Sequence, residues 1–74
     1  MAASSAVCSE RQRLFAAFKA ANQRLNQIHD MQVHALFADD LATFEGLEPQ
    51  LREARQNRDV VAEALQRHMR EHGC

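Results

Sequence analysis

Apolar positions in the second half of this 74-residue chain recur at alternating intervals of three and four residues. Side chains spaced in this way form one continuous seam along an α-helix, a pattern typical of helices that pack lengthwise against another helix. Arg58 occupies one seam position, where it either sets the register opposite Asn22 or lays its stem over the core with its charge in water. The seam comprises Phe44, Leu47, Leu51, Ala54, Arg58, Val61, Leu65, His68 and His72.

The first half carries a similar but wider apolar stripe. Its centre consists of Leu14, Phe18, Ala21, Leu25, Ile28 and Ala35, with Gln32 as an interruption. Phe15, His29, Val33 and Leu36 widen it on one side, and His29 is therefore expected to be partly buried. A stripe of this width indicates a helix that contacts more than one neighbour.

Turn residues are scarce, since the chain has only Gly46, Gly73 and Pro49. A sheet fold needs more turns than these residues can supply. Good helix formers dominate, and the alternation of β-branched residues typical of strands is absent. We therefore predict an all-α fold, a single helical-hairpin domain over residues 1–74 with two long antiparallel helices.

Local signals predict where these helices begin and end. Ser9 and Gln12 fit a capping box at the first helix, and Asp39 or Asp40 is expected to cap the next one. Pro49 breaks a helix interior but is accepted in a first turn, so a kink or short extra helix is expected near residues 40–48. The predicted order is a loose tail over 1–6, a helix over about 7–37, a turn over 38–41, a short helical segment over 40–46 and a main helix over about 49–72.

A turn near residues 38–41 also predicts the register between the two helices. Residues equally distant from the turn should lie side by side, which places Leu14 beside Leu65 and His68 beside Arg11 or Gln12. His72 then lies near Cys8. The two ends of the chain are expected to meet at the open end of the hairpin.

A lone hairpin leaves part of the wide stripe in water. Each fully buried Leu or Phe contributes about 1.5–3 kcal/mol, so exposure of several of them forfeits much of the available stability. Two hairpins that pair as a symmetric homodimer, a four-helix bundle, would bury these side chains. The interface is expected to include Phe15, Phe18, Val33, Leu36 and Phe37.

The open end is also where chemically capable side chains converge. His68 and His72 lie four residues apart on one helix face, Cys74 follows, and Cys8 is expected nearby. Two imidazoles and two thiolates suit tetrahedral zinc. The same residues also fit a Cys8–Cys74 disulfide, or two solvated histidines that stabilise the helix end through its dipole.

Charge and hydropathy exclude some classes of function. Acidic and basic residues are interspersed along the chain and the net charge is -1, so the one-sided basic footprint of a nucleic-acid binder is not expected. No apolar run is long enough to span a membrane, and the first residues do not resemble a secretory signal, so we expect a cytoplasmic protein.

No nucleophile is paired with a base, and catalytic residues are not expected. We therefore expect a non-enzymatic interaction or assembly module that acts through its surface, toward a second copy or another protein. A zinc-type metal-binding protein is the alternative, and a redox-active thiol protein is the third reading.

Overall fold

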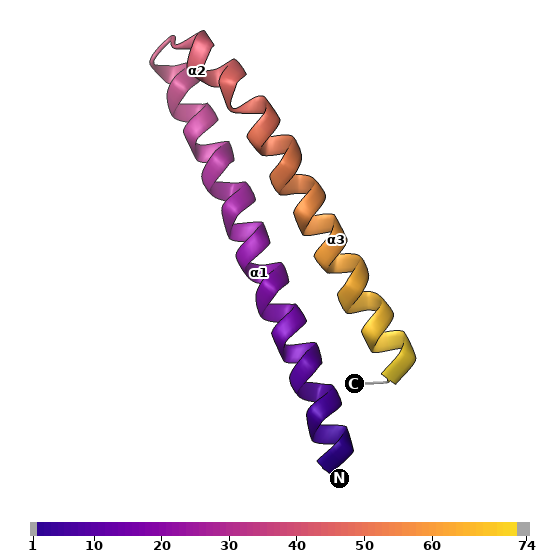
Figure 1. Cartoon of the computed structure of the whole chain (residues 1–74). Helices are drawn as coiled ribbons and strands as arrows, with labels where there is room; N and C mark the ends of the chain where they lie inside the picture. The colour runs from indigo at the N-terminus through magenta and orange to yellow at the C-terminus, as the bar shows by residue number, and fades with distance from the viewer. Residues whose placement is uncertain (1, 73–74) are drawn as a thin grey trace.

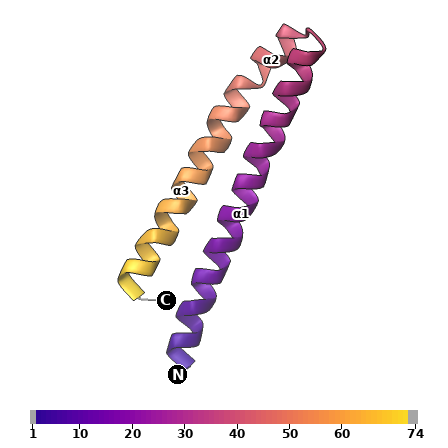
Figure 2. The same ribbon diagram turned by 180° about the vertical axis from the view of Figure 1, so that it is seen from behind.

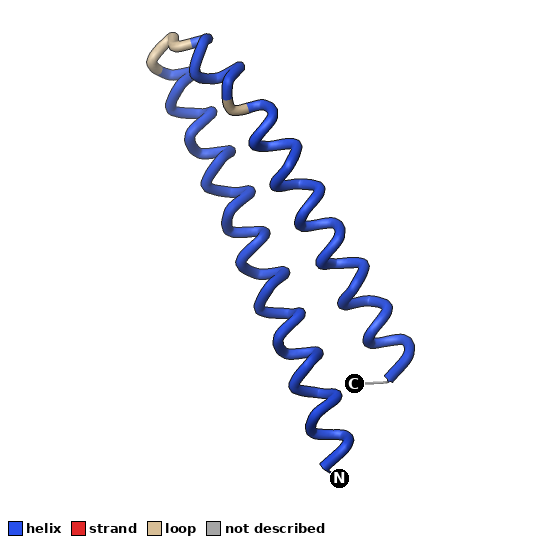
Figure 3. Tube along the Cα trace, in the orientation of Figure 1, coloured by secondary structure: helices blue, strands red, loops and turns tan. Residues whose placement is uncertain are grey.

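The computed structural model describes residues 2–72, and it describes side chains from Ser9 onward. Three helices follow one another: α1 over Ala2–Phe37, α2 over Leu41–Gly46 and α3 over Glu48–His72. Helices α1 and α3 run antiparallel and side by side, and the short α2 closes one end (Figures 1 and 2). The described residues contain no strand, and the molecule is a rod of 57 × 14 × 11 Å (Figure 3). The predicted all-α hairpin is confirmed.

The core is one seam between the two long helices. Its centre is a cluster in which Leu25 and Ile28 of α1 meet Leu51 and Ala54 of α3, with Leu47 from the junction before α3. Ile28 is the most enclosed side chain, with 1% of its surface exposed. The buried apolar residues, all at predicted seam or stripe positions, are Ala21, Leu25, Ile28, Ala35, Leu47, Leu51, Ala54 and Leu65.

Two successive aspartates build the closed end. Asp39 adopts a left-handed conformation, with φ of 56°, directly after α1. The N–H of Asp40 donates to the carbonyl of Ala35 at 2.8 Å, and the N–H of Asp39 donates to that of Leu36 at 3.1 Å. This is the Schellman arrangement that ends many helices, with aspartate where glycine is usual.

Asp40 then starts α2. Its Oδ1 accepts from the Thr43 N–H at 3.1 Å, and its Oδ2 accepts from the Thr43 hydroxyl at 2.6 Å. A side chain that satisfies a backbone donor in the first turn is an N-cap, so the predicted capping role is confirmed for Asp40.

The predicted break falls at Leu47, between α2 and α3. The Leu47 N–H still donates to the carbonyl of Thr43, at 3.1 Å, and the carbonyl of Leu47 accepts from the Leu51 N–H at 2.9 Å. Because α3 begins at Glu48, Pro49 lies in its first turn, where a missing N–H costs little.

Gln32, which interrupts the apolar stripe, forms hydrogen bonds that join α1 to the junction between α2 and α3. It is buried, and its Nε2 donates to Oε1 of Glu48 at 3.0 Å and to the carbonyl of Phe44 at 3.4 Å. Among the described residues no buried side-chain polar atom lacks a partner. Gln32 therefore lies in the seam without an unsatisfied amide.

The start of α1 differs from the prediction. The helix begins at Ala2, so the expected loose tail is wrong for residues 2–6, and Ser9 lies inside the helix instead of capping it. Residues 2–6 contain three alanines and no glycine or proline, so their helix propensity continues that of the following turns.

We expect Ile28→Ala to lower the free energy of unfolding by about 2–5 kcal/mol, because it leaves a cavity at the most enclosed position. Urea unfolding followed by circular dichroism measures the change. Val60→Ala is the matched control, since Val60 is exposed on α3 and should shift the same quantity by less than about 0.5 kcal/mol. Equal effects of the two changes would contradict this account of the core.

The Asp40 cap predicts a pH dependence. Its hydrogen bonds with the Thr43 hydroxyl and N–H hold the pKa of Asp40 below its usual value, so the carboxylate stabilises the fold above about pH 4 and loses this effect as pH falls through the lower folded value. Asp40→Ala should therefore destabilise the chain more at about pH 7 than at about pH 3, measured by urea unfolding. The control is Glu45→Gln, which removes a neighbouring exposed carboxylate. If Asp40→Ala lowered the free energy of unfolding by the same amount at both pH values, the capping role of the carboxylate would be contradicted.

Candidate functional site

The two histidines of the predicted terminal cluster lie in the last turns of α3. Their ring centroids are 4.7 Å apart, with 48° between the ring planes. His68 is half-buried beside α1, whereas His72 is exposed. The structure thus confirms that both imidazoles share one helix face, as their spacing of four residues predicts.

On α1, Glu10 lies close enough to His68 for the charge of His68 to affect the pKa of Glu10. The Arg13 guanidinium, which donates through Nε to Oε2 of Glu10 at 2.9 Å, lowers the pKa of Glu10, and the charge of His68 adds to this effect. His68 was expected beside Arg11 or Gln12, so the register is correct to within one helical turn. The open end therefore brings the start of α1 to the end of α3.

The two cysteines of the predicted zinc site cannot be placed in the same way. Cys74 and the side chain of Cys8 lie outside the described residues. Within the described part of the chain, no three His, Cys, Asp or Glu side chains are grouped as metal ligands would be. The zinc site and the Cys8–Cys74 disulfide stay predictions.

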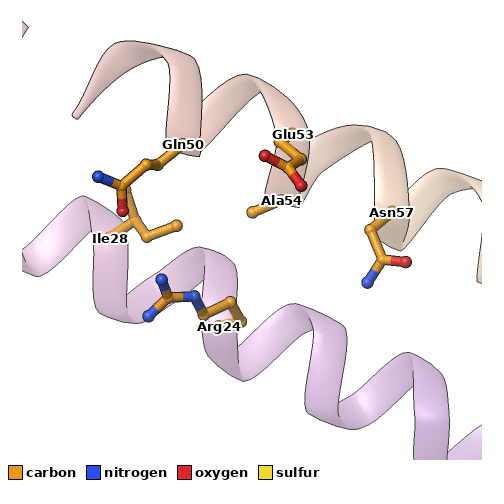
Figure 4. Close-up of a pocket in the computed structure, with 6 residues that line it drawn as sticks. All are labelled: Arg24, Ile28, Gln50, Glu53, Ala54 and Asn57. Atoms are coloured by element: carbon orange, nitrogen blue, oxygen red, sulfur yellow. The ribbon is translucent and has the colours of Figure 1, made fainter. Parts of the chain in front are cut away.

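A shallow groove of about 280 Å³ lies between the long helices, near their middle. Arg24 and Ile28 border it from α1, and Gln50, Glu53 and Asn57 border it from α3, with Ala54 at its floor (Figure 4). Gln50 reaches toward α1 beside Ile28, and Arg24 and Glu53 lie on facing sides. The groove offers amides and one charge of each sign around a small apolar floor.

A second surface feature is an exposed apolar band on α1, formed by Phe15, Val33, Leu36 and Phe37. Phe15 and Val33 are each 55% exposed, Leu36 is 60% exposed and Phe37 is 91% exposed. The wide stripe predicted that a single hairpin leaves these residues in water. Phe18, the fifth expected interface residue, is half-buried at the edge of the seam.

Four other exposed apolar residues of the described part of the chain were not singled out from the sequence: Met31, Leu41, Val60 and Met69. Leu41 lies at the start of α2, at the same closed end as Phe37, and Met69 lies near the end of α3. Leu41 could have been noticed because it immediately follows the capping Asp40 and lies outside the three-four repeat. The closed end therefore presents more apolar surface than the predicted stripe alone supplies.

Two polar residues at seam and stripe positions, Arg58 and His29, differ in how far they are buried. Arg58 is half-buried, with Nε and Nη2 donating to Oδ1 of Asp59 at 3.1 and 2.9 Å. Its head pairs with its exposed neighbour, which favours the reading in which the stem covers the seam and the charge stays near water. His29 is exposed, so the expectation of a partly buried His29 is wrong.

Comparisons with protein-family models, with curated proteins and with solved structures found no match for this chain. Among residues 2–72, no helix is both long enough and apolar enough to cross a membrane.

The zinc hypothesis predicts that adding Zn²⁺ to the reduced protein, with no affinity tag, raises its melting temperature, because a metal that joins the chain ends stabilises only the folded state. Replacing both His68 and His72 with alanine should abolish the rise. Replacing the exposed His29 and His34 with alanine is the matched control. A melting temperature that does not respond to Zn²⁺ would exclude a zinc site that stabilises the fold.

Proposed function

We propose that this chain is a small, non-enzymatic assembly module in which two copies pair through the apolar band into a four-helix bundle. The cytoplasmic location expected from the sequence belongs to the same proposal. The observation that carries it is the band itself: Phe15, Val33, Leu36 and Phe37 are all at least half exposed on one helix of a chain with a narrow core.

Simple energetics support pairing. Covering the exposed part of each band side chain contributes about 1 kcal/mol or more, and a symmetric interface counts every residue twice. The eight side chains of a pair together contribute about 8 kcal/mol or more, which offsets the several kcal/mol that association costs. Single exposed apolar residues are common on protein surfaces, but apolar residues gathered along one side of a helix point to a covered surface.

The shape and lining of the groove between the long helices support the non-enzymatic part of the proposal. The groove between the helices is open and shallow, and its polar lining consists of Arg24, Glu53 and the amides of Gln50 and Asn57. Catalytic and ligand sites usually enclose most of their substrate in a deeper pocket. A surface role is therefore favoured over chemistry in the groove.

One observation favours zinc binding as a second candidate function. The His68 and His72 rings lie 4.7 Å apart in the last turns of α3, and the charge of His68 helps to lower the pKa of Glu10 near the start of α1. Neighbouring imidazoles on one helix face are a common half of a metal site. Zinc binding is compatible with pairing, because it would use the open end and leave most of the apolar band uncovered.

Light scattering at micromolar concentration should give twice the 8.4 kDa mass of one chain. The double change Phe15→Ser and Leu36→Ser should shift the mass to that of a single chain, because it removes apolar contacts at both ends of the band. Val60→Ser, on the exposed surface of α3, should leave the doubled mass unchanged. A wild-type mass of one chain at this concentration would overturn the proposal.

A further inference from the structure

The charges of α1 and the following turn divide along the axis. Residues 9–24 contain four basic side chains and only one acidic side chain, Glu10, whereas residues 25–40 contain three aspartates and neither lysine nor arginine. The basic residues are Arg11, Arg13, Lys19 and Arg24, and the acidic ones are Asp30, Asp39 and Asp40. One half of this segment is therefore positive and the other negative.

Helix α3 shows no such division. Residues 48–59 contain three acidic and three basic side chains, and residues 60–72 contain two of each. Some of these charges pair along the same helix, as Arg67 does with Glu63 at 3.3 Å. Of the two long helices, only α1 therefore carries a charge pattern that distinguishes one direction of approach from the other.

Residues on one side of α1 also have a pattern that an antiparallel copy can match. Phe15, Asn22, His29 and Leu36 are spaced by seven residues, so they lie in one line along the helix beside the seam. Phe15 and Leu36, at the two ends of this line, are exposed and apolar, and the two residues between them are polar. The line reads apolar, polar, polar, apolar from either end.

We propose that two copies pair through their α1 helices, antiparallel, with the two-fold axis passing near Asn26. This inference rests on the proposed function and adds the partner's orientation and the helix that it uses. Phe15 of one copy then faces Leu36 of the other, and Asn22 faces His29. The basic half of each α1 lies along the acidic half of its mate.

Three features of the structure support this orientation. A hollow lined by Arg11, Gln12, Phe15, Ala16 and Lys19 lies on the surface of α1. In the antiparallel arrangement this hollow receives the mate's Leu36 and Phe37, while Arg11 approaches the mate's Asp39 and Lys19 approaches the mate's Asp30. Asn26, which is exposed, meets its own copy at the axis, where a pair of amides favours one register over its neighbours.

A parallel arrangement lacks these matches. It would place basic half against basic half and acidic half against acidic half, and like charges brought together in this way oppose association. It would also set Phe15 against Phe15 and leave the hollow without an apolar occupant from the closed end. Charge thus selects the direction, and the apolar ends supply the contact.

Single cysteines introduced into a Cys8→Ser, Cys74→Ser background test the geometry by mild oxidation. Asn26→Cys should cross-link with itself, because the axis brings both copies of position 26 together. Lys19→Cys and Val33→Cys should cross-link when mixed but only weakly when each is alone. Val60→Cys, on α3, is the control and should stay uncross-linked.

Charge reversal tests what selects the orientation. Arg11→Glu with Lys19→Glu should weaken self-association about tenfold at low salt, since several exposed charge pairs each contribute a fraction of a kcal/mol. The difference from wild type should shrink at about 1 M salt, where charges are screened within about 3 Å. Arg55→Glu with Arg70→Glu, the matched reversal on α3, should weaken association much less.

The outcomes separate the two proposals. Self-cross-linking of Lys19→Cys as strong as the mixed reaction would show a parallel pair, and cross-linking through Val60→Cys would show pairing through α3. Either result, or a doubled mass without any cross-link from α1, overturns the antiparallel arrangement and leaves the assembly role standing. A wild-type mass of one chain overturns both the assembly role and the antiparallel arrangement. The Cys8→Ser, Cys74→Ser protein should keep the doubled mass, which shows that the two replacements leave the pair intact.

Discussion

The packing of one apolar stripe of α1 against one seam of α3 holds this molecule together. Ile28, Leu25 and Leu51 form its centre. A chain of this size gains only about 3–5 kcal/mol from a single core. The hydrogen bonds of the aspartates at the closed end and those of the Gln32 amide help to keep these two stripes in register.

The closed end shows how much local sequence can specify. Asp39 ends one helix in a left-handed conformation, and Asp40 begins the next by capping Thr43. Pro49 needs a helix start nearby, because only there is its missing N–H harmless. The break at Leu47 follows from these three residues, and Leu47 itself is buried because the break keeps it on the seam. The turn therefore sets the register for the whole hairpin.

The helices, their register and the exposed band could all be predicted, because the spacing of apolar residues is a property of the chain itself. The start of α1 could not, since the serine that resembles a cap lies in a segment where alanines already favour helix. His29 was misjudged because membership of a wide stripe does not say which edge a single neighbour covers. The open end was predicted only in part: spacing places His68 and His72 together, but a ligand set also needs the positions of thiols that follow no periodic rule.

The width of the α1 stripe bears on whether α1 has a second neighbour, and the division of its charges bears on how that neighbour is oriented. A stripe wider than one seam favours the proposed second neighbour, but apolar contact is non-directional and does not say how that neighbour would lie. The separation of Arg11 and Lys19 from Asp30 and Asp39 supplies a direction, because only an antiparallel copy brings opposite charges together along the full contact. A helix in which both signs of charge are mixed along its length, as in α3, could bury apolar surface equally well but could not choose an orientation. Stability and specificity in this small chain are therefore assigned to different residues of the same helix.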